Sequence, residues 1–394
     1  MWSIFRDRRA VALLLSSTLT VMSNAIISPA LPGIRDAYAD TPNVELLTRL
    51  LVAAPSLLVA LFAPFAGMLA DRFGRRRQLL LGVGLFGLCG SAGFWLPDMY
   101  SLFASRLILG LGVAMIMTAQ TALVGDYFEG ETRGRFMGLQ MAATNFGGLI
   151  LIAFAGLLAN HGPFLPFALY AVALLFLPFL VLSLTEPDRA AAGHGAAQGS
   201  RGEPGWIRLL VASVILCALT FITFYIVPTQ SAFYLPTIGY SDPGSAALLL
   251  MSMTFAAGVT SLGYGRLRHW LGRARIMGLG FGLMALAFVV LSFAHHLAPA
   301  AGSILIMGAG AGLIFPTMLS VALEVAPADR RGMAAGALTM AIFLGQFISP
   351  FVSLPLVSHY GFSSTFLVYA VILAVCALCA LAIYRSRVGV PVRA

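Results

Sequence analysis

Apolar segments of about 20 residues recur along the whole chain, and this recurrence constrains the fold more than any other feature. Each segment is long enough to cross the ~30 Å hydrocarbon layer of a bilayer as a helix. In lipid, the backbone polar groups must be bonded within the segment, so the pattern is helical. It predicts an all-α, polytopic membrane protein with twelve transmembrane helices. They lie near residues 11–31, 46–66, 78–97, 100–122, 136–158, 164–184, 207–235, 246–264, 276–294, 301–322, 334–357 and 365–383.

The composition excludes a water-soluble globular protein. Of the 394 residues, 59% are hydrophobic and 10% are charged, whereas soluble domains carry roughly 25% charged residues. The net charge of +9 suggests a nucleic-acid partner only at first sight. The basic residues lie in short loops without interleaved aromatic side chains, so no nucleic acid is expected. Such clusters beside helix ends indicate topology and contact with anionic membrane lipid.

The arginines also predict the orientation. All 24 basic residues are arginine. With the N-terminus inside, every arginine except Arg35, Arg49 and Arg106 falls on the cytoplasmic side, as the positive-inside rule requires. We therefore expect a multi-pass protein of a bacterial-type inner (plasma) membrane, with both termini cytoplasmic.

Residues on the two sides of the chain's midpoint match at a constant separation of 198 positions. Gly110 matches Gly308 and Gly147 matches Gly345, for example, and the same separation fits three loop regions. This regularity predicts a duplicated six-helix unit joined by a polar linker. Parallel repeats of this kind are typical of transporters that hold a substrate at the repeat interface. The expected division is an N-terminal bundle at 1–184, a cytoplasmic linker at 185–206 and a C-terminal bundle at 207–394.

The loop after the second span runs Gly67-Met-Leu-Ala-Asp71-Arg72-Phe-Gly74-Arg75 and resembles the signature loop of the major facilitator superfamily. Its glycines permit close helix approach and a tight turn, and Asp71 could accept from helix N-terminal amides. Arg75 could pair with Asp126 at the end of the fourth span. The resemblance implies a cytoplasmic gate, and the alternative is that the arginines only set topology. The gate residues are Gly67, Asp71, Gly74, Arg75 and Asp126.

A second copy of the loop lies in the other half of the chain. It contains Gly265, Gly272 and Arg273, with His269 in the place of Asp71, and Glu324 stands where the first half has Asp126. Because histidine titrates near neutral pH, we expect this second gate to be weaker or pH-dependent.

The fourth span contains Arg106 followed by Gly110 and Gly112. This resembles an R-x-x-x-G-x-G motif associated with proton-coupled exporters of the superfamily. A charge ~10 Å inside the span costs roughly 3 kcal/mol, so Arg106 should face an aqueous cavity or a partner. The candidate partners are backbone carbonyls, Glu45 and the solute, and the alternative is that Arg106 extends to the outer interface.

The sequence does not identify the coupling ion. None of the acidic residues falls in mid-membrane, and Asn24 stands in the first span where many proton-coupled exporters hold an acid. Coupling could run through Arg106 with Glu45, or the protein is not driven by protons. Protons are therefore only a candidate partner.

Several polar residues are expected in a substrate or coupling cavity, because the superfamily resemblance places their spans around it. The alternative is that they join helices by hydrogen bonds. Nearby Phe221, Phe224 and Phe315 favour an amphipathic organic solute over a sugar. The cavity candidates are Asn24, Arg106, Asn145, Tyr225, Gln230 and Gln346.

Taken together, the resemblance implies a secondary transporter that exports small amphipathic organic molecules by alternating access. One alternative is a uniporter or symporter for an organic anion held by Arg106. A membrane-embedded enzyme is disfavoured, because ionisable groups do not cluster within the spans. The C-x-x-C of Cys376 and Cys379 lacks further ligands and predicts helix packing, so no metal or cofactor is expected. The expected partners are a small-molecule substrate and membrane lipid, and the protein is expected to be a monomer.

Overall fold

The computed structural model describes residues 6–187, 205–327 and 330–385. Within these ranges, ten helices are long and apolar enough to cross a membrane. Two of them are bent double spans, because Gly272 (φ 72°) interrupts α11 (Pro243–Ser292) and Gly361 (φ 74°) interrupts α13 (Arg331–Arg385). Only glycine adopts these backbone angles readily. The all-α architecture with twelve spans is therefore confirmed, and the fold makes this a multi-pass membrane protein.

The first half of the chain supplies six spans. The opening span is α2 (Arg8–Ala25) continued by a short 3-10 turn, η1 (Ser28–Ala30), and by α3 (Leu31–Ala37). Its interruption coincides with Pro29 and Pro32, which lack the amide needed to continue a helix. The next five spans are α4 (Val44–Phe73), α5 (Arg75–Gly90), α6 (Met99–Tyr127), α7 (Gly130–Ala159) and α8 (Ala168–Ser183).

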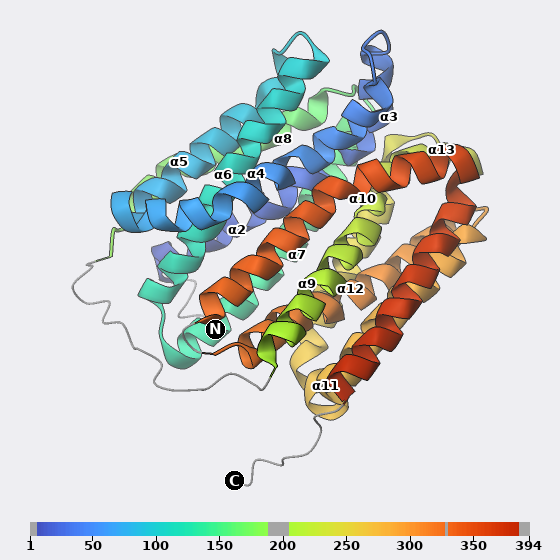
Figure 1. The fold of residues 1–394 in the computed structure, drawn as a ribbon. Coiled ribbons are helices and arrows are strands. Elements are labelled where there is room, and N and C mark those ends of the chain that lie inside the picture. Colours follow the sequence, from blue (N-terminus) through green and yellow to red (C-terminus); the bar gives the residue numbers. More distant parts are fainter. Residues whose placement is uncertain (1–5, 188–204, 328–329, 386–394) are drawn as a thin grey trace.

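The second half begins with another broken span. It consists of α9 (Trp206–Phe224) and α10 (Ile226–Tyr234), which meet at Tyr225. Pro228 provides no amide to the last turn of α9, and this explains the break. The chain then continues through η4 (Leu235–Ile238), α11, α12 (Leu297–Val325) and α13. Figure 1 shows α13 running up the molecule, turning at one end and returning.

The same close helix contacts occur in both halves. A side chain at Gly110 of α6 would collide with the backbone carbonyl of Pro55 in α4. A side chain at Gly308 of α12 would collide in the same way with the carbonyl of Met253 in α11. Since 55 and 253 differ by the same 198 positions as 110 and 308, the separation found in the sequence is repeated in the packing.

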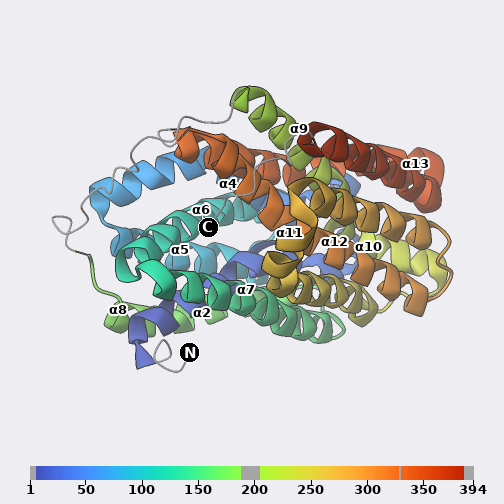
Figure 2. The same cartoon turned by 90° about the horizontal axis from the view of Figure 1, so that it is seen from below.

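Two seams join the helices of the two halves. Helix α7 packs along α11, and α4 packs along α13. Figure 2, seen from below, shows the blue-to-green helices of the first half beside the yellow-to-red helices of the second. Any site between the halves must therefore be built from these helices and from the broken spans between them.

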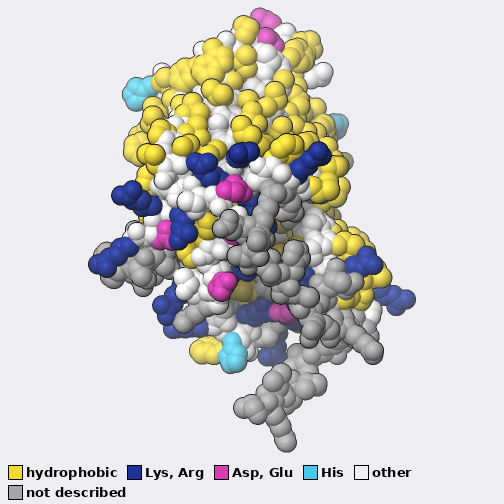
Figure 3. Space-filling view, turned by 90° about the vertical axis from the view of Figure 1, so that its left-hand side faces the viewer, with side chains coloured by type: hydrophobic (Ala, Val, Ile, Leu, Met, Phe, Trp, Pro, Cys, Tyr) yellow, Lys and Arg dark blue, Asp and Glu magenta, His cyan; other side chains and the backbone are white. Residues whose placement is uncertain are grey.

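The bundle has one arginine-rich end. It carries two ion pairs: Arg75 at the start of α5 with Asp126 at the end of α6, and Arg268 in the first part of α11 with Glu324 at the end of α12. Figure 3 shows arginine side chains in dark blue over the lower part of this face, below a surface dominated by hydrophobic side chains. We call the opposite end the far end. It includes Asp98, whose carboxylate accepts from the amides of Ser101 and Tyr100 at the start of α6. These hydrogen bonds hold the pKa of the Asp98 carboxyl below its usual value.

Candidate functional site

A buried polar cluster lies where the two halves meet. It contains Asn24 of α2, Ser56 of α4, Tyr225 between α9 and α10, and Gln346 of α13. The Ser56 hydroxyl donates to the Gln346 Oε1 at 2.6 Å, and the Asn24 Nδ2 lies 3.5 Å from the same oxygen. Three helices are therefore linked through one amide group, and both halves contribute to it.

Two atoms of this cluster lack a hydrogen-bond partner. The Oδ1 of Asn24 and the hydroxyl of Tyr225 are buried and unpartnered, although the Tyr225 ring places its hydroxyl beside Ser56 and Asn24. Leaving a polar group buried without a partner costs about 1–3 kcal/mol. The Asn24 Oδ1 and the Tyr225 hydroxyl lie in the same cluster and both lack a hydrogen-bond partner, so they are suited to bind the polar group of a solute.

Three phenylalanines stand next to the cluster. Phe221 of α9 stacks on Phe315 of α12 with ring centroids 4.5 Å apart, and Phe224 meets Phe315 edge-on at 5.3 Å. Phe221 lies one helical turn before Tyr225. The site therefore combines unpartnered polar atoms with a large apolar surface, which is the usual make-up of a small-molecule site.

The structure brings together Asn24, Tyr225 and Gln346 from the residues expected in the cavity. Asn145 lies elsewhere, on the seam between α7 and α11, where its side chain packs near Gly258. Its Nδ2 donates to the Met141 carbonyl of its own helix at 2.9 Å. Asn145 is therefore occupied by a local bond and is not joined to the cluster.

Gln230 also lies outside the cluster, nearer the far end. Its Oε1 accepts from the Nε of Arg49 at 2.8 Å, and its Nε2 donates to the hydroxyl of Ser353 at 3.1 Å. Sequence reasoning missed both Ser56 and Arg49 as site residues. Arg49 could have been identified from the sequence, because it is a charged residue inside an apolar segment. Ser56 could not, because a single serine in such a segment is not distinctive.

The side chain of Arg106 is fully buried. The ion pairs recorded for Glu45 in the described residues are with Arg49 and Arg35. The Nη2 of Arg106 donates to the Gly90 carbonyl at 3.0 Å, and the guanidinium lies 4.6 Å from the Phe167 ring and 4.5 Å from the Tyr170 ring. Of the partners considered, the backbone carbonyl is the one observed. Extension to the interface does not occur, because the surrounding helices α5 and α8 enclose the side chain.

The first gate at the arginine-rich end contains the expected ion pair. Arg75 pairs with Asp126, which joins the start of α5 to the end of α6. The side chain of Asp71 lies outside the described part of the structure. Two amides at the start of α5 donate to the Glu186 carboxylate, at 2.7 Å from Arg75 N and 3.0 Å from Arg76 N. Sequence spacing did not reveal this contact, because Glu186 follows α8 and reaches α5 only through tertiary packing.

Gly74 makes that contact possible. Its φ of 101° ends α4, and a Cβ at this position would lie 3.0 Å from the Glu186 carboxylate. The glycine of the motif therefore serves both the turn between the helices and the approach of an acidic cap to the positive end of α5.

The second gate differs from the first in its ion pair. Glu324 pairs with Arg268, which also lies 3.1 Å from the hydroxyl of Tyr264. The arginine in this pair is therefore not Arg273, the match of Arg75. Gly272 interrupts α11 as Gly74 separates α4 from α5, and His269 is exposed at this end. Gly265, like Gly67, has open space where a Cβ would lie.

Glycines along the two seams divide by position. Those close to the arginine-rich end have nothing within 4 Å of a built Cβ, namely Gly67, Gly134, Gly138, Gly265, Gly332 and Gly336. Those farther along the same helices are in contact: a Cβ at Gly258 would lie 3.2 Å from Asn145, and one at Gly156 would collide with Ala247. Both of these contacts cross between the halves. The halves therefore touch toward the far end and separate toward the arginine-rich end.

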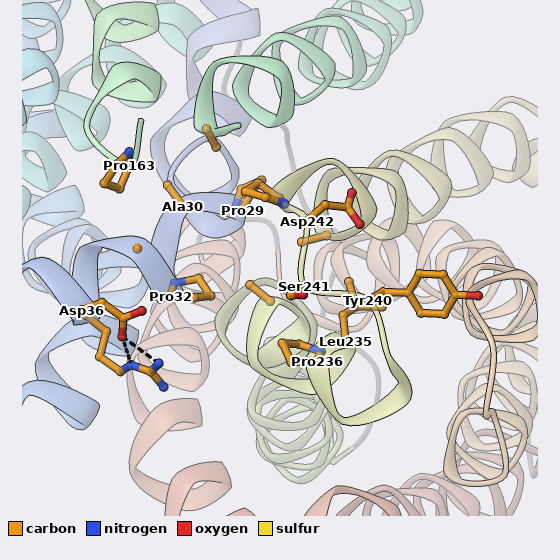
Figure 4. A pocket seen from close by; sticks show the side chains of 16 residues that line it. Pro29, Ala30, Pro32, Asp36, Pro163, Leu235, Pro236, Tyr240, Ser241 and Asp242 are labelled. Atoms are coloured by element: carbon orange, nitrogen blue, oxygen red, sulfur yellow. Dashed lines mark hydrogen bonds and ion pairs between the residues drawn. The ribbon is translucent and has the colours of Figure 1, made fainter. Parts of the chain in front are cut away.

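A pocket of about 360 Å³ lies between the halves at the far end. Figure 4 shows prolines from both halves around it, with Asp36 at one side and Asp242 at the other. Asp36 forms an ion pair with Arg35. Asp242 is already engaged, because its carboxylate caps α11 by accepting from the amide and hydroxyl of Ser245. The pocket belongs to the contact surface of the halves.

This arrangement of two six-helix groups around a buried interface site agrees with the family comparison. The family model described as Major Facilitator Superfamily matches residues 13–267 and 239–393. The chain belongs to this superfamily. The resemblance carried by the loop motifs is thereby confirmed for the whole chain.

Individual members of the superfamily are similar to this chain at 23–31% sequence identity. Multidrug resistance protein 2 of Bacillus subtilis is 31% identical over 58% of this chain and 60% of the relative. The class C tetracycline resistance protein of Escherichia coli is 23% identical over 87% of this chain and 88% of the relative. The chain spans only part of several other relatives, and the smallest share among these is 30% of the relative's length.

A solved structure supports the fold of this superfamily member. The crystal structure of a D-xylose-proton symporter superimposes with a TM-score of 0.79 at 20% identity, covering 95% of this chain and 96% of the other. At this identity the likeness concerns the fold alone.

Proposed function

We propose that this superfamily member is a secondary transporter that exports small amphipathic organic molecules by alternating access. Its similarity to multidrug and tetracycline resistance proteins supports an efflux role. The buried cluster carries the proposal, because the unpartnered Asn24 Oδ1 and Tyr225 hydroxyl lie between the halves beside three phenylalanines. A solute with an apolar body and one or two polar groups satisfies both parts of this site.

The proposal also says which side of the membrane each end of the molecule faces. The arginine-rich end faces the cytoplasm of a bacterial-type plasma membrane, since positive loops stay inside, and the structure then corresponds to a state that admits solute from the cytoplasm. Residues 1–184 and 207–394 move as two bundles, and residues 185–206 link them. The protein works as a monomer in contact with anionic lipid, and protons are the proposed coupling ion.

Transport in proteoliposomes tests this function. Purified protein is reconstituted and the flux of tetracycline and of ethidium is followed with and without a pH gradient, with D-xylose as a polar control. We expect flux of the amphipathic compounds to exceed that of empty liposomes and to respond to the gradient, and D-xylose to show no protein-dependent flux. Flux of D-xylose alone would contradict the proposed solute class.

A pair of tyrosine variants then tests the site. Tyr225→Phe removes a hydroxyl that the proposal assigns to the solute, so the apparent affinity should fall roughly three- to ten-fold, as expected for one neutral hydrogen bond. Tyr369→Phe is the matched control, because its hydroxyl is also buried and unpartnered, but it lies against Phe288 inside the second half. Equal losses of apparent affinity in the two variants would contradict the assignment of the Tyr225 hydroxyl to the solute.

A further inference from the structure

A second layer of polar contacts joins the halves nearer the far end. Arg49 of α4 is 5% exposed, and its Nε donates to Gln230 of α10 at 2.8 Å. Its guanidinium also lies 4.1 Å from the centre of the Phe233 ring. Both of these partners belong to the other half of the chain. Arg49 is thus a buried cation whose environment is completed across the interface.

The remaining partners of Arg49 come from its own half. The Nη1 donates to the carbonyl of Glu45 at 2.6 Å and pairs with the Glu45 carboxylate one turn earlier in α4. Arg35, the other charged group beside this carboxylate, lies 3.6 Å from Glu45 and pairs with Asp36. These bonds persist if the halves separate, whereas the bonds to Gln230 and Phe233 do not. Of the contacts of Arg49, those with Gln230 and Phe233 are therefore the ones that favour the joined halves.

Gln230 connects this layer to a third helix. While its Oε1 accepts from Arg49, its Nε2 donates to Ser353 of α13 at 3.1 Å. Ser353 lies seven residues after Gln346, and Arg49 lies seven residues before Ser56. Seven residues are nearly two helical turns, so each pair shares a helix face, about 10 Å apart. The solute cluster and the Arg49 layer are therefore carried by the same faces of α4 and α13.

We propose that Arg49 and Gln230 form a latch that holds the far ends of the two halves together, and that this hydrogen bond must break before solute is released there. Both are positioning residues, because neither contacts the solute cluster. The inference rests on the proposed alternation between two open states, but not on the direction of transport or on the identity of the solute. A solute that moves α4 against α13 at Gln346 would act on the latch through the shared helix faces.

Distances between spin labels test the latch in the reconstituted full-length protein. Labels are attached at Ala39→Cys and Thr237→Cys, two exposed far-end positions of opposite halves, in a background without the four native cysteines. The ratio of long to short distances reports opening of the far end. Gln230→Ala leaves the Nε of Arg49 unpaired in the closed state, so the ratio should rise roughly ten-fold, the effect of losing one charge-assisted hydrogen bond.

The reverse change provides the second arm. Gln230→Glu offers Arg49 a charged acceptor and should lower the open fraction, and this effect should disappear in the Arg49→Ala background. Thr229→Ala is the matched control. The Thr229 hydroxyl donates to the carbonyl of Tyr225, one turn earlier in the same half, at 2.8 Å, so this substitution should leave the ratio unchanged.

Two results overturn the proposal in distinguishable ways. If the wild type has two distance populations and neither Gln230 variant shifts them, the latch assignment is wrong while the alternation stands. If the wild type and every variant keep a single short distance, with and without tetracycline, then the alternation itself is wrong and the latch fails with it.

Discussion

Two arginines are buried in the membrane-spanning part, and their partners differ. Arg49 donates from its Nε to Gln230 and from its Nη1 to Glu45. Arg106 donates one hydrogen bond to Gly90, and its Nε and Nη1 are buried without a partner. A buried cation is costly unless its donors are satisfied. The two residues should therefore respond differently to the same substitution.

We expect Arg106→Leu to unfold at the same or a higher temperature than the wild type, because the change removes two unpartnered donors and keeps an apolar side chain among Phe167 and Tyr170. The gain should be about 1–3 kcal/mol at most. Arg49→Leu should lower the free energy of unfolding by about 1–3 kcal/mol, since it leaves Gln230 without its donor. Thermal unfolding of the purified proteins in detergent measures both.

A marked loss of stability in Arg106→Leu would mean that the cation–ring contacts with Phe167 and Tyr170 outweigh the unsatisfied donors. The comparison of the two stabilities is direct, because both substitutions remove one charge and add the same side chain. If Arg49→Leu were as stable as Arg106→Leu, the bonds around Arg49 would contribute no net stability.

At the scale of helices, glycines have two distinct uses. Gly110 and Gly308 allow α6 to touch α4 and α12 to touch α11, where a Cβ would meet a backbone carbonyl. Gly67 and Gly265 instead stand in open space at the arginine-rich end. A backbone carbonyl cannot move aside as a flexible side chain can, so the first pair is required for the packing of each half.

We therefore expect Gly110→Ala and Gly308→Ala to lower the free energy of unfolding by about 1–3 kcal/mol each, the usual effect of overpacking. Gly67→Ala is the matched control and should be neutral or slightly stabilising, because alanine favours the helix. Thermal unfolding in detergent measures the difference, and equal losses at all three positions would contradict the packing described for α4 and α6.

Helix ends show where prediction from sequence stopped. The turns at Gly74 and Gly272 were expected from the motif and are present in the backbone. Sequence spacing offered Asp71 as an acceptor for helix N-terminal amides, because spacing identifies only near neighbours. Glu186, which accepts from two amides at the start of α5, lies more than one hundred residues away and comes close only because α8 ends beside the α4–α5 turn.

For the whole molecule, the distribution of arginine predicts the orientation. A reporter fused after Arg35 should lie on the outer side of the membrane, and a reporter fused after Pro187 should lie on the cytoplasmic side, because positive segments are retained in the cytoplasm. A pair of reporters with opposite requirements, such as alkaline phosphatase and green fluorescent protein, measures this in cells. Matching signals at the two fusion points, or the inverted pattern, would exclude the proposed orientation.

The sequence by itself determined the class of fold, the number of spans and the superfamily, because each depends on features that a linear chain displays. Apolar length decides whether a segment crosses lipid, and a glycine before an arginine run decides where one helix must end. The repeat at 198 positions likewise predicted contacts that recur between Gly110 and Pro55 and between Gly308 and Met253.

Only the tertiary structure decided which polar residues act together. Asn24, Ser56, Tyr225 and Gln346 come from four separate spans, and nothing in their sequence distances predicts that one amide links three of them. The same holds for Arg49, whose partner Gln230 is 181 residues away. Hydrophobic periodicity specifies that a helix is buried in lipid or protein but not its rotation against its neighbours, and this rotation decides which side chains meet.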